Sequence, residues 1–183
     1  MSGYRFDRIK LLLVDDNVHM RKMLSTILGA FGVTNIFEAA DGKAGWEKMR
    51  SLNPDIVFLD WMMPVMNGLE FTKLVRTSPD CPNPFTPIIM LTGHTQIEHV
   101  IQARDAGVTE FLAKPISANG VMARMTAVIE NPRSFVRTGA YFGPCRRRRS
   151  AEEYQGPERR ASGPHDKEQV LIRDTGERKR GAA

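Results

Sequence analysis

The sequence lacks any long hydrophobic run. No apolar stretch reaches the roughly 18 residues that a transmembrane helix needs, so no membrane span is expected. The first ten residues, MSGYRFDRIK, contain neither the apolar segment nor the cleavage site of a secretory signal. These absences argue against the membrane and secreted classes of protein.

Cysteine is scarce as well. Cys81 and Cys145 are the only two, and they stand far apart without other metal-ligating residues at zinc spacing. Two isolated cysteines give neither a disulfide framework nor a zinc site. We therefore expect a protein of the reducing cytoplasm.

Positive charge is unevenly distributed along the chain. The net charge is +5, but residues 1–130 hold 13 Lys and Arg against 14 Asp and Glu, whereas residues 131–183 hold 13 against 7. The basic character thus belongs to the C-terminal part and does not describe the surface of the preceding part.

Short apolar runs alternate with amphipathic segments over residues 8–130. Good N-cap residues, such as Asn17, Asp41 and Ser117, precede several of the amphipathic segments. This alternation predicts one α/β domain, a five-stranded parallel sheet with helices on both faces, for which a flavodoxin-like strand order is one common solution. The expected strands are 10–14, 33–39, 56–59, 88–91 and 108–113, and the expected helices are 18–31, 42–52, 69–75, 95–106 and 118–130.

Residues 131–183 show no such periodicity. They are rich in Gly, Pro, Ser and charges, with an unbroken arginine run at 146–149. A weak repeat, Y-x-G-P-x-R-R, occurs at 141–147 and 154–160, but two copies are too short for a repeat fold. We expect a basic, arginine-rich tail that is mostly disordered or folds only conditionally.

Polar residues end four of the five expected strands. Because the carboxyl ends of parallel strands meet at one edge of a sheet, these side chains should converge on one crevice. Clustered carboxylates need a hard divalent cation to remain ionised together, and oxygen ligands without His or Cys favour Mg²⁺. An ammonium and a hydroxyl beside them could bind a phosphoryl group, with Asp60 as the nucleophile for an acyl phosphate. The residues concerned are Asp15, Asp16, Asp60, Thr92 and Lys114.

The motifs occur in a telling order. D-D follows the first expected strand, D-x-x-M-P-x-M-N-G the third, L-T-G the fourth and K-P the fifth. This pattern resembles the receiver domain of two-component response regulators over about residues 8–130. No DNA-binding helical domain or enzymatic effector follows residue 130, so the chain resembles a single-domain, CheY-like regulator and not an enzyme.

The resemblance implies a role for each matching residue. Asp60 would be the phosphoacceptor, and Asp15, Asp16, Asp60 and the backbone carbonyl of Met62 would bind Mg²⁺. Thr92 and Lys114 would bind the phosphoryl group, and the Lys114–Pro115 bond would be cis. Phe111 takes the place of the switch aromatic, which turns inward as Thr92 moves towards the phosphate.

The same resemblance implies the partners. A sensor histidine kinase or a histidine phosphotransfer protein would donate the phosphoryl group. The surface formed by the fourth helix, fifth strand and fifth helix would then bind a downstream protein, which the sequence does not name.

Departures from the family pattern are small. Gly93 stands where alanine is frequent, and Met62 and His94 take the two positions that flank the phosphoryl group and influence its lifetime. The proline-rich loop at 77–87 is longer than usual, and we assign it no role in the chemistry.

Other readings remain open at this point. Asp15-Asp16 alone could be a polar turn, Lys114 a solvated residue and Phe111 a core aromatic. The arginine run could contact nucleic acid, although the interleaved glutamates favour protein contact or simple solvation. A flavodoxin-like cofactor binder or hydrolase is weaker, because no glycine-rich phosphate loop follows the first strand.

Overall fold

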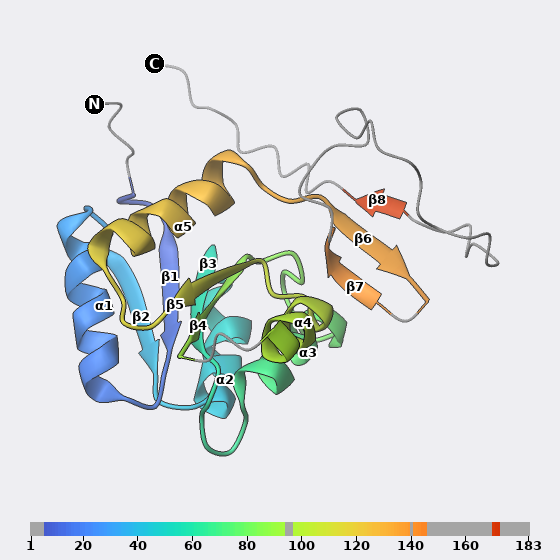
Figure 1. Cartoon of the computed structure of the whole chain (residues 1–183), viewed down its shortest axis with the longest axis horizontal. Coiled ribbons are helices and arrows are strands. Elements are labelled where there is room, and N and C mark those ends of the chain that lie inside the picture. Colours follow the sequence, from blue (N-terminus) through green and yellow to red (C-terminus); the bar gives the residue numbers. More distant parts are fainter. Residues whose placement is uncertain (1–5, 94–96, 140, 146–169, 173–183) are drawn as a thin grey trace.

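A five-stranded parallel sheet forms the centre of the computed structural model, which describes residues 6–93, 97–139, 141–145 and 170–172 (Figure 1). The strand order is β2-β1-β3-β4-β5, so the flavodoxin-like prediction is confirmed. β1, β3 and β4 are apolar on both faces because helices cover the sheet on both sides. The strands are β1 (Lys10–Val14), β2 (Asn35–Ala39), β3 (Ile56–Asp60), β4 (Ile88–Thr92) and β5 (Glu110–Ala113).

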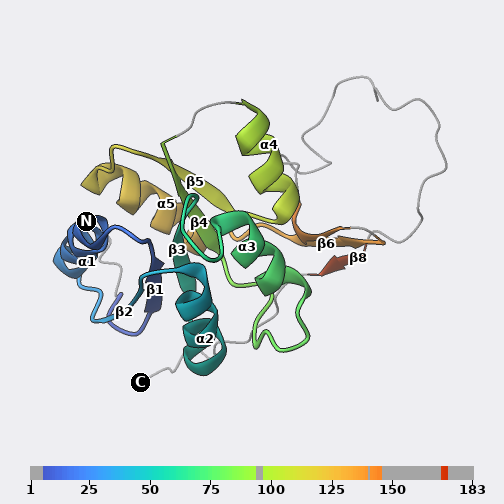
Figure 2. The same cartoon turned by 90° about the horizontal axis from the view of Figure 1, so that it is seen from below.

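Five helices enclose this sheet, with α1 and α5 on one face and α2, α3 and α4 on the other (Figure 2). The alternating residues of the strands divide into two core layers accordingly. Leu11 and Leu13 pack with α1 and α5, whereas Leu12 and Val14 pack with α2, α3 and α4. The helices are α1 (Val18–Ala30), α2 (Gly42–Leu52), α3 (Gly68–Thr77), α4 (Ile97–Ala106) and α5 (Ala118–Glu130).

Helix ends follow the capping residues in the sequence. Asn17, Asp41 and Ser117 accept backbone N–H groups at the starts of α1, α2 and α5, as predicted. α3 begins earlier than expected, because the Asn67 side chain forms a capping box with Glu70. These caps fix where each helix begins after the loop that follows the preceding strand.

A second, antiparallel sheet follows α5 and was not predicted. β6 (Phe135–Thr138) and β7 (Tyr141–Pro144) form a hairpin, and β8 (Val170–Ile172) pairs with the other edge of β6 (Figure 1). The hairpin lies within residues 131–183, which we expected to be mostly disordered or to fold only conditionally. The rest of that tail, 146–169 and 173–183, lies outside the described residues, and so does the arginine run.

The hairpin docks through an aromatic cluster. Phe135 and Phe142 lie 5.1 Å and 5.3 Å from the ring of Phe85, which belongs to the proline-rich loop before β4. β7 also contacts α3 and α4. The proline-rich loop therefore supports the hairpin through Phe85.

Arg76 ties this cluster to the domain. Its guanidinium is buried and donates to the carbonyls of Gly107, Pro84 and Thr86 while lying over the ring of Phe135. Burial lowers the pKa of Arg76 to about 10. The buried cation joins the end of α3, the loop before β4 and the turn before β5 to the hairpin.

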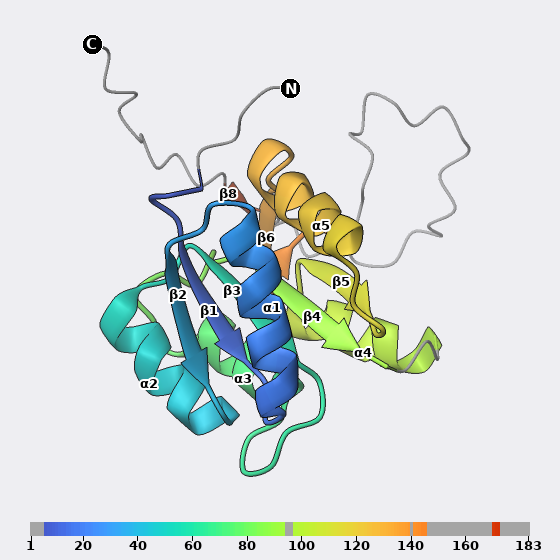
Figure 3. The same cartoon turned by 90° about the vertical axis from the view of Figure 1, so that its left-hand side faces the viewer.

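Arg133 anchors the hairpin from its first residues. Its guanidinium donates to the carbonyl of Thr109, 3.0 Å away, and to that of Cys145. Thr109 directly precedes β5, so the hairpin sits at the amino ends of the strands, opposite the predicted functional edge (Figure 3).

Among the described residues, no helix is long and apolar enough to cross a membrane.

Candidate functional site

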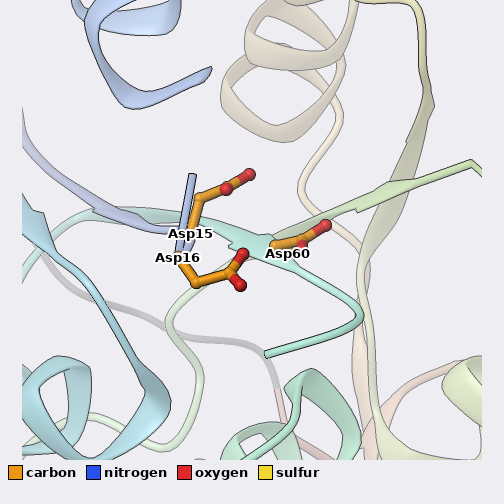
Figure 4. Close-up of side chains that lie close together, drawn as sticks. All are labelled: Asp15, Asp16 and Asp60. Carbon is orange, nitrogen blue, oxygen red and sulfur yellow. The ribbon is translucent and has the colours of Figure 1, made fainter. Parts of the chain in front are cut away.

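Three carboxylates meet at the carboxyl edge of the sheet. Asp15 and Asp16 follow β1, and Asp60 ends β3, which is hydrogen-bonded beside β1 (Figure 4). One carboxylate oxygen from each residue lies within 4.8 Å of the others. Asp15 and Asp60 are buried and Asp16 is exposed, so the cluster opens to solvent on one side.

The turn after β1 orients the first carboxylate. The Asp15 amide donates to the carbonyl of Ala39 in β2, which continues the sheet by one residue. The Asn17 amide then donates to Asp15 Oδ1 at 2.8 Å. Asn17 thus caps α1 with its side chain and fixes Asp15 with its backbone.

Lys114 reaches the same edge from β5. Its Nζ lies 2.7 Å from Asp60 Oδ1 and 3.4 Å from Asp15 Oδ2. Its backbone amide donates to the carbonyl of Thr92 at 2.8 Å, so the ends of β4 and β5 are linked directly. Four of the five convergent residues of the sequence analysis are therefore connected by contacts, and Asp16 joins through the carboxylate cluster.

The Asp60 carboxyl group and the Lys114 ammonium form an ion pair in which both pKa values are raised. Burial raises the pKa of Asp60; the hydrogen bond from Lys114 opposes this, and the charge of Asp15 adds to the rise. Burial would lower the pKa of Lys114, but its hydrogen bond to Asp60 and the charges of Asp60 and Asp15 raise it overall. Lys114 alone therefore does not neutralise the cluster, which favours a further cation.

The donor set fits Mg²⁺. All three ligands offer hard oxygen atoms, and their spacing would let one small ion contact each while keeping bound water. Within the described part of the chain, the cluster includes no His or Cys side chain. The exposed side, at Asp16, leaves room for ligand oxygens from outside the protein.

The model of the response regulator receiver domain family matches residues 11–126. The chain belongs to this family. Receiver domains of this type act as phosphorylation-dependent response regulators in two-component systems, typically bind Mg²⁺ at an acidic pocket, and interact with kinases and downstream targets.

Individual relatives agree with this assignment. The chain is similar to chemotaxis protein CheY1 of Helicobacter pylori strain 26695, with 34% identity over 66% of this chain and 97% of the relative. It is also similar to chemotaxis protein CheY of Pseudomonas aeruginosa, with 31% identity over 67% and 97%. Chemotaxis response regulator CheY4 of Vibrio cholerae has a similar structure, with a TM-score of 0.61, 35% identity, and coverage of 66% of this chain and 98% of that one.

The receiver domain places the remaining predicted residues at or near this edge. Thr92 ends β4 and is buried. Phe111 lies in β5, is half-buried, and packs against the core layer beneath α4. The Lys114–Pro115 bond is cis, as the resemblance implies.

Two predicted positions carry less structural information. Met62 follows Asp60 by two residues and is exposed, and the role of its carbonyl as a metal ligand stays a prediction. His94 lies outside the described residues.

The sequence analysis missed two close neighbours of Asp60. Trp61 is buried, and its ring lies 5.3 Å from that of His99 on α4. A Cβ added to Gly68 would collide with the carbonyl oxygen of Asp60, so α3 begins directly against the end of β3. Asn67 and Gly68 end the D-x-x-M-P-x-M-N-G motif of the sequence analysis, but the contact of Gly68 with Asp60 depends on the path of the intervening loop.

Proposed function

We propose that Asp60 is the phosphoacceptor of this response regulator and takes its phosphoryl group from a histidine kinase or a histidine phosphotransfer protein. The observation that carries the proposal is the convergence of three carboxylates, whose oxygens lie within 4.8 Å of one another, one of which, that of Asp60, Lys114 contacts at 2.7 Å. An uncompensated acidic cluster beside an ammonium is suited to hold a cation and a phosphoryl group together.

The proposed reaction is transfer of the phosphoryl group from the donor to Asp60. The phosphorus–nitrogen bond of the donor phosphohistidine breaks while an Asp60 carboxylate oxygen forms the new phosphorus–oxygen bond. The departing imidazole nitrogen keeps the electron pair. Lys114 is placed to bind one phosphoryl oxygen, and the Thr92 hydroxyl another. Bound Mg²⁺, held by Asp15, Asp16, Asp60 and the Met62 carbonyl, would supply the remaining charge compensation.

The proposed output is protein contact through α4, β5 and α5. Phe111 lies in β5, within the strand that also delivers Lys114 to the phosphoryl group. Val100, Ile101 and Ile129 are exposed apolar residues of α4 and α5. Phosphorylation would shift an existing equilibrium between two positions of Thr92 and Phe111 and thereby change this surface.

The proposed role is signalling, not turnover of a separate substrate, and we place it in the cytoplasm with the donor kinase. The alternative of nucleic-acid binding rests on the arginine run at 146–149, outside the described residues. The cofactor-binding alternative has lost its support, because the chain belongs to the receiver family.

The test is chemical phosphorylation of the purified protein with acetyl phosphate and Mg²⁺, followed by intact-mass spectrometry. We expect one added phosphoryl group on the wild type and none on Asp60→Asn. Asp80→Asn, which removes an exposed carboxylate from the proline-rich loop, should label as the wild type does. Equal labelling of Asp60→Asn would refute the assignment of the phosphoacceptor.

A further inference from the structure

Arg21 lies one turn into α1, behind the acidic pair. Its Nη1 donates to the carbonyl oxygen of Asp15 at 2.7 Å and to that of Asp16 at 3.4 Å. The side chain is 13% exposed; its bond to the Asp15 carbonyl is partly buried, whereas the longer bond to the Asp16 carbonyl is exposed. One guanidinium group thus holds two consecutive peptide carbonyls whose residues carry two of the three clustered carboxylates.

The other side of the guanidinium is fixed to β2. Nε of Arg21 lies 3.1 Å from Oε2 of Glu38, and the Glu38 carbonyl in turn accepts from Lys48 of α2. Arg21 therefore connects three neighbouring elements: α1, the end of β1 and β2. A planar guanidinium with several donors in fixed directions is suited to such multiple contacts, whereas an ammonium is not.

These contacts restrict the turn that carries the acids. Arg21 holds the Asp15 carbonyl at 2.7 Å and the Asp16 carbonyl more loosely at 3.4 Å, and these bonds restrict rotation of the two peptide planes. The Asp15 carboxylate is held separately by the Asn17 amide. The acidic side chains are thereby presented to the site without needing the cation to order them, and a site organised in advance loses less entropy on binding.

Charge points to a geometric role for Arg21. A positive group this near the cluster would repel Mg²⁺, but Glu38 pairs with it at 3.1 Å and offsets that repulsion. The pair contributes hydrogen bonds in fixed positions and little net charge.

We propose that Arg21 is a positioning residue for the Mg²⁺ site, acting through the backbone carbonyls of Asp15 and Asp16. The inference rests on the proposed function, in that it assumes that these carboxylates bind Mg²⁺. Groups that orient metal ligands from outside the coordination shell commonly change metal affinity by about 10–100-fold when they are replaced.

The experiment is a Mg²⁺ titration of the full-length chain in which NMR chemical shifts of the backbone amides report binding. It compares four proteins: the wild type, Arg21→Lys, Arg21→Gln and Lys22→Gln. We expect both Arg21 variants to weaken Mg²⁺ binding by about 10-fold. Lys22→Gln removes a charge from an exposed neighbour on the same helix and should bind as the wild type does. Phosphorylation by acetyl phosphate should require more Mg²⁺ in the Arg21 variants but approach the wild-type rate at saturation.

Other results would overturn the inference in distinguishable ways. If Arg21 acts only through its charge, Arg21→Lys should have the Mg²⁺ affinity of the wild type and Arg21→Gln should bind Mg²⁺ more tightly. A merely structural role predicts a lower melting temperature with unchanged Mg²⁺ affinity. If Arg21→Gln does not fold, the comparison of Arg21→Lys with Lys22→Gln decides. Absence of Mg²⁺ binding by the wild type would instead contradict the proposed function.

Discussion

The environment of Asp60 in the folded protein is unfavourable for its ionised carboxylate. It is buried and lies near the charge of Asp15, and both raise its pKa; the hydrogen bond and charge of Lys114 and a backbone hydrogen bond from Trp61 offset this rise only in part. Residues of functional sites commonly lower the free energy of unfolding, because their positions suit the chemistry of the site and not stability. Single-residue effects on stability and on function should therefore diverge at this position.

Asp60→Asn should raise the free energy of unfolding in metal-free buffer at pH 7 by about 1 kcal/mol. The folded-state pKa of Asp60 lies above its ordinary value of 3.8. Its contribution to stability is therefore fully present below pH 3.8 and is lost as the pH rises through the folded pKa. Urea unfolding of both proteins with EDTA, at pH 7 and under more acidic conditions, measures the difference. The advantage of Asn should shrink on acidification; a less stable variant at pH 7 would show that the Lys114 bond outweighs burial and repulsion.

At the scale of elements, the hairpin of β6 and β7 extends the folded unit beyond the receiver family match at 126. It covers Phe85 and the buried guanidinium of Arg76, both within the receiver domain. Removing the hairpin would expose this cluster and leave Arg76 with a wetter environment. The proline-rich loop would lose the elements against which it packs.

Truncation after residue 130 should therefore cost more stability than truncation after residue 145. The shorter chain loses the burial of Phe135, Val136 and Phe142 and the bonds of Arg133, for which we expect about 2 kcal/mol after the entropy of ordering the hairpin is subtracted. Chemical unfolding of the two truncated proteins beside the full chain gives the comparison. Equal stability of all three would mean that the hairpin docks too weakly to contribute.

In the molecule as a whole, the candidate functional site and the hairpin of β6 and β7 lie at opposite edges of the sheet. The carboxylates and Lys114 lie at the carboxyl ends of the strands, whereas Arg133 binds the carbonyl of Thr109 before β5. β5 connects the two edges within four residues, Glu110–Ala113. A ligand bound at the carboxyl edge should therefore stabilise a folded unit that includes the hairpin at the amino edge.

Mg²⁺ should stabilise the folded chain by mass action. At ten times its dissociation constant the gain is about 1.4 kcal/mol, because the ion binds the folded state and not the unfolded chain. Thermal unfolding across a Mg²⁺ series, at constant ionic strength, measures it. Asp60→Asn serves as the control and should gain much less. An equal gain in that variant would point to general screening of charge and not to a bound ion.

The alternation of strands and helices, the caps of α1, α2 and α5, and the polar residues at the carboxyl edge of the sheet could all be predicted from the sequence. These features could be predicted because they are local or follow from one rule: the polar residue that ends a parallel strand must lie at the common edge. The sequence placed Asp15, Asp60 and Lys114 at this edge, but the strand order that brings them into contact came from the fold.

Tertiary structure alone decided the hairpin, the Arg76 cluster and the contacts of Arg21. β6 and β7 have only four residues each, too few for a periodic signal in a segment rich in Gly, Pro and Arg. Arg76 resembles any helical arginine until Phe135 and three carbonyls surround it. Such roles arise from partners distant in the chain, and burial and hydrogen bonding assign them only once the chain has folded.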